Sequence, residues 1–305
     1  MIARGAALFA AILLWAPAAP AAELRVVTTT PSLADLARRV GGERVKASAL
    51  MRGPESPHNV VPTPSFSMRL RKSDLFVHLG LDAEPWVPSL VRSARQRRLL
   101  PGSEANIDAS RGISLLEVPA KGGLSRALGD IHVYGNPHYL LDPLNGVIVA
   151  GTLRDAFARA DPAGAEDYRR NASALAERLR ALTGRLVARL RPWLGRRVVV
   201  YHRSWPYFLH RFGLVEGGQV EPRPGIVPGP RHVSSLAARM RQEGMAVVVL
   251  ETYSNRKVGR HLAQEAGGRA VVLAQEVNAT PEAVDYPALF EHNVGVLADA
   301  LGSGE

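Results

Sequence analysis

The chain of 305 residues contains no cysteine. It therefore folds without disulfide bonds, which matter most to domains too small to bury a sufficient core. The absence also excludes lipid attachment through an N-terminal cysteine. A chain of this length is long enough for two domains of ordinary size, each with its own core.

Long apolar runs are also scarce. The N-terminal run covers residues 6–15, follows Arg4, and gives way to a small-residue region at 16–22. A membrane-spanning helix needs ~20 apolar residues, whereas this pattern is typical of a secretory signal. We expect residues 1–22 to be a signal peptide, cleaved near residue 22, and the mature protein to diffuse freely in a bacterial periplasm. A retained membrane anchor is the alternative.

Aromatic residues make up only 6% of the chain, although its net charge is +10. A nucleic-acid partner requires a basic stripe with aromatic residues between the charges. Here arginines are spread along the chain, and their densest groups, at 69–72, 95–98 and 196–197, have no such aromatics. We therefore expect no nucleic-acid partner. The basic surface favours contact with anionic lipid headgroups.

Strand and helix patterns alternate in the first part of the chain. Residues 23–30 alternate and are rich in β-branched side chains, which predicts a strand, and residues 33–40 predict a helix stopped by two glycines. Further strands are expected at 44–51 and 75–79, and further helices at 65–72 and 84–98. This alternation predicts a mainly parallel sheet with helices on its faces, in an N-terminal α/β lobe over residues 23–143.

Residues 144–195 show helix patterns only. Asp142 followed by Pro143 predicts an N-cap and the first turn of a helix over 144–160. A longer helix is expected from 166 to about 190, because leucines recur at spacings of three and four along one face. We expect these linking helices to act as a rigid spacer between two lobes; an ordinary surface helix is the alternative.

The second α/β pattern fills residues 196–305 and predicts a C-terminal lobe. Strands are expected at 197–201, 246–250 and 270–273, and helices at 206–212, 234–243, 256–266 and 287–301. Residues 213–230 are rich in glycine and proline and predict a long loop. The expected fold class is therefore α/β, with two Rossmann-like lobes of mainly parallel sheets joined by a long rigid helix.

Three histidines lie in three separate motifs. His58 stands in SPHN, ahead of PTPS; His138 stands in GNPHY, ahead of LDP; and His202 follows an apolar run at 198–201. Each lies at the edge of an expected element, where binding groups gather. Singly, each is more often a capping or otherwise satisfied histidine than a metal ligand. Together they suit zinc and other late transition metals, because neutral imidazole is their common ligand.

These motifs resemble those of the cluster A-I substrate-binding proteins of zinc or manganese ABC transporters, a family of periplasmic zinc-binding proteins. The matching segments are TTTPSLADLARRVGG, SPHNVVPTPS, KSDLFVHLGLDAEPW, GNPHYLLDP, VVVYHRSWPYFLHRFGL, EPRPGIVPGPRHVSSL and VVLETYSNRKVGRHLAQEAGG. The resemblance implies one metal ion between two lobes. Its ligands would be His58 and His138 from the N-terminal lobe and His202 from the C-terminal lobe.

The resemblance further implies that the protein captures Zn²⁺ and delivers it to an inner-membrane ABC permease. Three nitrogen ligands favour Zn²⁺ over Mn²⁺, which prefers oxygen; manganese is the alternative cargo within the class. A periplasmic metallochaperone is a further candidate partner, and the protein is expected to be a monomer. Zinc-specific members often carry a His- and Asp-rich loop, which residues 111–126 do not match, so we do not expect several ions to be scavenged at once.

The family usually places an aspartate ligand after the last strand, where this sequence has Ala274. Glu276 is therefore the candidate fourth ligand, and a water molecule is the alternative, because a three-histidine zinc site with an open position is chemically ordinary. His132 is a candidate auxiliary ligand, a partner of a ligand, or a solvated loop histidine. Glu251, at a strand end, either orients an imidazole or is a loop carboxylate.

A zinc-dependent hydrolase is the alternative from another class, because three histidines and a water resemble a catalytic zinc site. The sequence has no HExxH motif, and Glu251 and Glu276 are the only candidate general bases. We therefore expect a binding protein and no enzyme.

Overall fold

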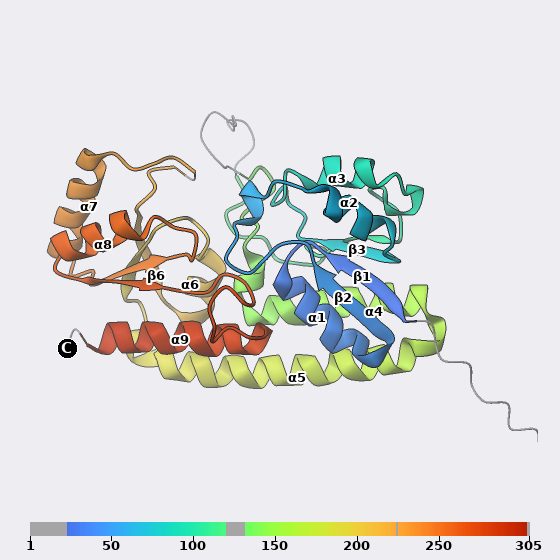
Figure 1. Cartoon of the computed structure of the whole chain (residues 1–305). Coiled ribbons are helices and arrows are strands. Elements are labelled where there is room, and N and C mark those ends of the chain that lie inside the picture. The colour runs from blue at the N-terminus through green and yellow to red at the C-terminus, as the bar shows by residue number, and fades with distance from the viewer. Residues whose placement is uncertain (1–22, 120–131, 224, 304–305) are drawn as a thin grey trace, which may run out of the picture.

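The computed structural model describes residues 23–119, 132–223 and 225–303. The expected signal peptide at 1–22 lies outside these residues, as does part of the loop at 111–126. The described chain forms two α/β lobes side by side above a long shared helix (Figure 1). None of its described helices combines the length and the apolar character needed to cross a bilayer.

The N-terminal lobe contains a four-stranded parallel sheet in the order β2-β1-β3-β4. The bounds are β1 Leu24–Thr28, β2 Val45–Ala49, β3 Leu75–His78 and β4 Asn106–Asp108, with helices α1 Pro31–Gly41, α2 Pro64–Arg71 and α3 Val87–Ala94. Val26 and Val77 pack into one apolar cluster, and Val27 and Phe76 into another. Both faces of the sheet are thus buried, as parallel sheets require.

The C-terminal lobe repeats this plan, with a four-stranded parallel sheet in the order β6-β5-β7-β8. The bounds are β5 Arg197–Val200, β6 Val215–Gln219, β7 Val247–Leu250 and β8 Arg269–Val272, with helices α6 Pro206–Phe212, α7 Pro230–Gln242, α8 Arg256–Glu265 and α9 Tyr286–Gly302. The fold is therefore the α/β class expected from the sequence, with parallel pairing throughout the described strands.

Two helices connect the lobes. Helix α4 (Pro143–Ala160) begins as expected, because the Asp142 carboxylate accepts a hydrogen bond from the Leu144 N–H at 2.9 Å. Helix α5 (Ala165–Leu190) has 26 residues and runs beneath both lobes, with α9 beside it (Figure 1). Leu179 and Leu190 of α5 belong to one apolar cluster that includes Leu36 of the first lobe and Leu297 of the second. The lobes thus share a continuous core.

The prediction that residues 213–230 form a loop was wrong over Val215–Gln219, which is the edge strand β6. Two central glycines make this segment look like a loop. One of them, Gly217, is closely packed, since a Cβ there would meet the Met245 sulfur unless that side chain moved. The three-residue strand β4 was also missed. The helix expected over 84–98 is shorter, because Arg95 adopts a left-handed conformation at φ 54° and ends α3.

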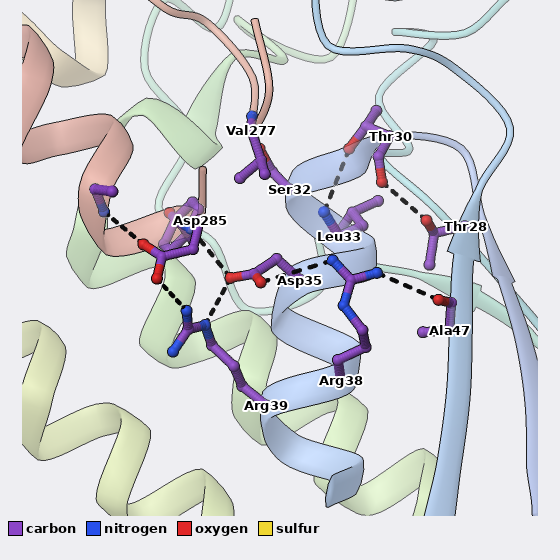
Figure 2. Close-up of polar contacts among 12 residues, drawn as sticks. Thr28, Thr30, Ser32, Leu33, Asp35, Arg38, Arg39, Ala47, Val277 and Asp285 are labelled. Atoms are coloured by element: carbon purple, nitrogen blue, oxygen red, sulfur yellow. Dashed lines mark hydrogen bonds and ion pairs between the residues drawn. The ribbon is translucent and has the colours of Figure 1, made fainter. Parts of the chain in front are cut away.

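Polar contacts also fasten α1 of the first lobe to α9 of the second (Figure 2). The Asp35 carboxylate accepts hydrogen bonds from Arg39 Nε at 2.6 Å and from the Tyr286 N–H at 3.0 Å. Arg39 Nη2 reaches Asp285 at 2.6 Å, and Asp285 in turn caps α9 by accepting from the Ala288 N–H at 2.7 Å. One guanidinium thus bridges two carboxylates at the junction of the lobes.

We expect Arg39→Met to lower the free energy of unfolding by about 1–3 kcal/mol, because it leaves the partly buried carboxylates of Asp35 and Asp285 without their shared cation. Urea denaturation of the metal-free protein, followed by circular dichroism, measures the loss. The matched control is Arg185→Met, since Arg185 pairs with Glu291 at 3.4 Å on the exposed surface and such pairs contribute ~0–1 kcal/mol. If both variants lose the same free energy of unfolding, the α1–α9 contacts stabilise the protein no more than an exposed ion pair does.

Candidate metal centre

The structure brings His58, His138 and His202 together between the two lobes. Each offers one ring nitrogen to a group whose atoms all lie within 4.8 Å of one another. The Nε2 atoms of His58 and His138 are 3.2 Å apart, and the His202 ring centroid lies 5.8 Å and 5.7 Å from theirs. Segments 144 residues apart in the sequence therefore converge on one point.

The convergence follows from the way parallel strands align their carboxyl ends. His58 lies in a short 3-10 turn, Pro57–Asn59, after β2. His138 immediately precedes another 3-10 turn, Tyr139–Leu141, that leads into α4. His202 stands two residues beyond the end of β5. Loops beyond the carboxyl ends of parallel strands are where such folds place their ligands.

Each of the three imidazoles is oriented through its other ring nitrogen. The Nδ1 atom of His58 lies 2.9 Å from the Ala83 carbonyl oxygen, that of His138 lies 3.0 Å from Asn136 Oδ1, and that of His202 lies 2.8 Å from a Glu221 carboxylate oxygen. All three partners are oxygen acceptors, so each Nδ1 carries the proton and each Nε2 carries the lone pair. This assignment rests on the identity of the partners.

The separation of two Nε2 atoms at 3.2 Å suits a tetrahedral ion. Zinc–nitrogen bonds of ~2.0–2.1 Å at a tetrahedral angle place two ligand nitrogens about 3.3–3.4 Å apart. Two lone pairs facing each other at this distance repel unless a cation lies between them. Burial and the neighbouring histidines His58, His202 and His132 hold the pKa of His138 well below its usual range, so this imidazole is neutral and ready to bind a metal.

Glu221 and Asn136, which orient two of the imidazoles, were missed by sequence reasoning. Glu221 follows β6, and because that strand was taken for a loop, nothing marked the strand end that brings Glu221 to the site. Glu251, which was a candidate for this role, instead accepts hydrogen bonds from Trp205 Nε1 at 2.7 Å and from the Ser254 hydroxyl. It is fully buried, so it is not a solvated loop carboxylate either.

Glu276 lines the same pocket as His58 and His138, but its carboxylate is hydrogen-bonded to helix α1. Its carboxylate accepts a hydrogen bond from the Ser32 N–H at 2.9 Å, in the first turn of that helix, where a negative charge is favourable. Among the described residues, the group of ligand atoms within 4.8 Å contains the three histidines and not Glu276. Ala274 is buried, and its N–H is bound by Asn293 Oδ1 at 2.8 Å.

His132 lies closer to the site than its sequence position suggested. Its ring centroid is 4.9 Å from that of His58 and 6.4 Å from that of His138. Burial, together with the neighbouring His58 and His202, lowers the pKa of His132 to about 3. His132 is therefore a neutral, partly buried imidazole and not a solvated loop residue.

We expect Glu276→Gln to alter the pH dependence of stability, because burial raises the pKa of Glu276 from its ordinary value of 4.5 to about 7. The folded state then binds more protons than the unfolded state between these two pH values, so stability falls as pH rises through this window. Relative to Glu276→Gln, the metal-free wild type should lose about 2–3 kcal/mol between pH 4.5 and pH 8.

Urea denaturation at a series of pH values measures this difference. The control is Glu43→Gln, at an exposed position in the turn after α1, which should follow the wild type throughout. If Glu276→Gln also runs parallel to the wild type, the carboxyl group is ionised at neutral pH and does not carry the buried proton inferred for it.

Comparison with known proteins identifies the family of the chain. A family model described as zinc-uptake complex component A, periplasmic, matches residues 26–300. The zinc-binding protein AdcA of Streptococcus pyogenes is 24% identical over 285 residues, which cover 90% of this chain and 55% of AdcA. The chain thus spans about half the length of the curated relatives that it matches first.

Two solved structures share the fold. A crystal structure of ZnuA superposes with a TM-score of 0.76 at 23% identity and covers 91% of this chain and 99% of its own. The binding protein FpvC from Pseudomonas aeruginosa, in complex with Mn²⁺, gives a TM-score of 0.78 at 23% identity and covers 93% and 100%. Because the family model spans nearly all of the described residues, the chain belongs to the family of periplasmic zinc-uptake component A proteins.

Proposed function

We propose that this protein is a periplasmic solute-binding protein that captures Zn²⁺ between its two lobes and delivers it to an inner-membrane ABC permease. The observation that carries the proposal is the meeting of three imidazoles from two lobes, with ligand atoms within 4.8 Å of one another. The ligands would be Nε2 of His58, His138 and His202. Membership of a family described by zinc uptake supports the same conclusion.

Zinc is the cargo that this chemistry favours. Three neutral nitrogen donors suit Zn²⁺, whereas Mn²⁺ prefers a higher proportion of oxygen ligands. The carboxylate of Glu221 hydrogen-bonds one of the three histidines, at 2.8 Å from Nδ1 of His202. Mn²⁺ remains the alternative cargo, since a structural relative, FpvC, has been crystallised with Mn²⁺ and with Ni²⁺.

The site is suited to binding and not to hydrolysis. A zinc hydrolase needs a general base beside the metal-bound water. The two candidate bases are engaged elsewhere, Glu251 with Trp205 and Ser254 and Glu276 with the Ser32 N–H. Residues 1–22 would direct export, and the mature protein would act as a monomer in the periplasm. Its partner is the permease, and a metallochaperone is a candidate for loading the site.

We expect His138→Ala to weaken zinc binding by at least about 100-fold, because it removes one of three protein ligands from a site whose affinity is built from the whole set. Isothermal titration of the metal-free protein with Zn²⁺, in competition with a chelator, measures this. The control is His261→Ala, since His261 is exposed on α8 and should bind as the wild type does. Unchanged affinity in a folded His138→Ala variant would remove the proposed site.

We also expect Glu221→Gln to weaken zinc binding by roughly 10–100-fold, the usual effect of losing the partner of a metal-bound imidazole. The amide oxygen still accepts from His202 Nδ1, but the negative charge that raises the basicity of the ring is gone. The same titration measures the loss, and Glu216→Gln, in the neighbouring strand β6, is the control. An effect no larger than that of Glu216→Gln would show that the carboxylate does not tune His202.

A further inference from the structure

The three proposed ligands leave one position of a tetrahedral zinc site to be filled. The residue at the family's usual position is Ala274, which has no donor and is fully buried. The nearest carboxyl group after it, that of Glu276, is held by the Ser32 N–H at 2.9 Å at the start of α1. Among the described residues, the group of ligand atoms within 4.8 Å of one another does not include an oxygen of Glu276.

His132 has a ring nitrogen, Nε2, that no hydrogen bond within the described residues engages. This atom is also shielded from solvent. A buried polar atom without a partner is destabilising and needs an explanation of its own. The ring lies against that of His58, with centroids 4.9 Å apart and planes at 38°, so the atom is on the border of the proposed site.

A turn after His132 holds this residue near the proposed site, but its side chain does not reach the other three histidines. The His132 carbonyl oxygen accepts from the Gly135 N–H at 3.3 Å, in a tight turn that leads directly into the His138 motif. Gly135 has φ 116°, a conformation that favours glycine. In this structure the group of ligand atoms within 4.8 Å does not include His132, so a rotation of its side chain is needed to bring Nε2 among the other three.

We propose that His132 supplies the fourth ligand of the zinc-loaded protein, so that the metal is held by four imidazole nitrogens. Three would come from the N-terminal lobe and one, His202, from the C-terminal lobe. The inference rests on the proposed function, since it completes the same site. A ligand set of four nitrogens without oxygen discriminates further against Mn²⁺ and leaves the full charge of the ion to be balanced by Glu221, which contacts His202.

The test is to count metal-bound imidazoles by NMR in the full-length exported protein. Long-range proton–nitrogen spectra of ¹⁵N-histidine-labelled protein separate a metal-bound ring nitrogen from a free one, and single histidine variants assign the signals. On addition of one equivalent of Zn²⁺, we expect metal-bound Nε2 signals from His58, His138, His202 and His132. In His132→Phe, which keeps a planar ring beside His58, we expect three.

The same variants separate ligation from packing. His132→Phe and His132→Gln should both bind Zn²⁺ at least about tenfold more weakly than the wild type, since even the loss of a ligand's partner costs 10–100-fold. His261→Phe, on the exposed face of α8, is the control and should keep four metal-bound signals. Circular dichroism checks that each variant is folded.

The outcomes distinguish this inference from the proposed function. If Zn²⁺ shifts the signals of His58, His138 and His202 but leaves His132 as it was, the three-histidine site stands and the fourth ligand is not His132. Wild-type affinity in His132→Phe would likewise overturn the inference, because ring packing alone would then suffice. If Zn²⁺ shifts none of the four, the proposed function itself fails.

Discussion

The fixed position of the two lobes relative to each other is the constraint on which the candidate metal centre depends. His202 belongs to one lobe and His58 and His138 to the other, yet their ligand atoms must stay within 4.8 Å. Helix α5 contributes leucines to a core shared by both lobes, and Arg39 bridges α1 to Asp285 at the start of α9. These three histidines, held in place in this way, do not have to be ordered when an ion binds.

The orientation of each imidazole is set separately, within its own lobe. Ala83 holds His58 and Glu221 holds His202. Asn136 does more, because its Oδ1 atom accepts from His138 and its Nδ2 atom donates to the carbonyl oxygen of Arg203, next to His202, at 2.9 Å. A single amide thus orients one ligand and joins the two lobes at the site itself. The shared core sets the distances between ligands, and these local bonds set their directions.

The sequence predicts the parts of this architecture that depend on local pattern. Apolar β-branched runs indicated the buried parallel strands, Asp142 before Pro143 indicated the cap of α4, and three motifs indicated the histidines. It did not predict β6, because the closely packed glycines of this strand look like a loop. Glu221 was missed for the same reason. Which nitrogen of each ring faces the candidate site depends on partners 2 to 25 residues away, and no local pattern shows these.

Three glutamates follow strands β6, β7 and β8, which are consecutive in the sequence, and their roles also depend on partners that no local pattern shows. Glu221, Glu251 and Glu276 all lie beyond strand ends, and this position alone does not distinguish them. Their partners differ. Glu221 accepts from a histidine, Glu251 from an indole and a hydroxyl, and Glu276 from the first turn of a helix.

The role of each carboxylate therefore follows from the donor that it meets and not from its position at the sheet edge. Glu221 contacts a candidate metal ligand directly, so this carboxylate can act on an ion through that imidazole. Glu251 acts within its own lobe and Glu276 across to α1 of the other, and both help to hold the frame in which the histidines meet. Because these carboxylates bind other groups, the proposed ligands are nitrogen donors. Nitrogen donors favour Zn²⁺ over Mn²⁺.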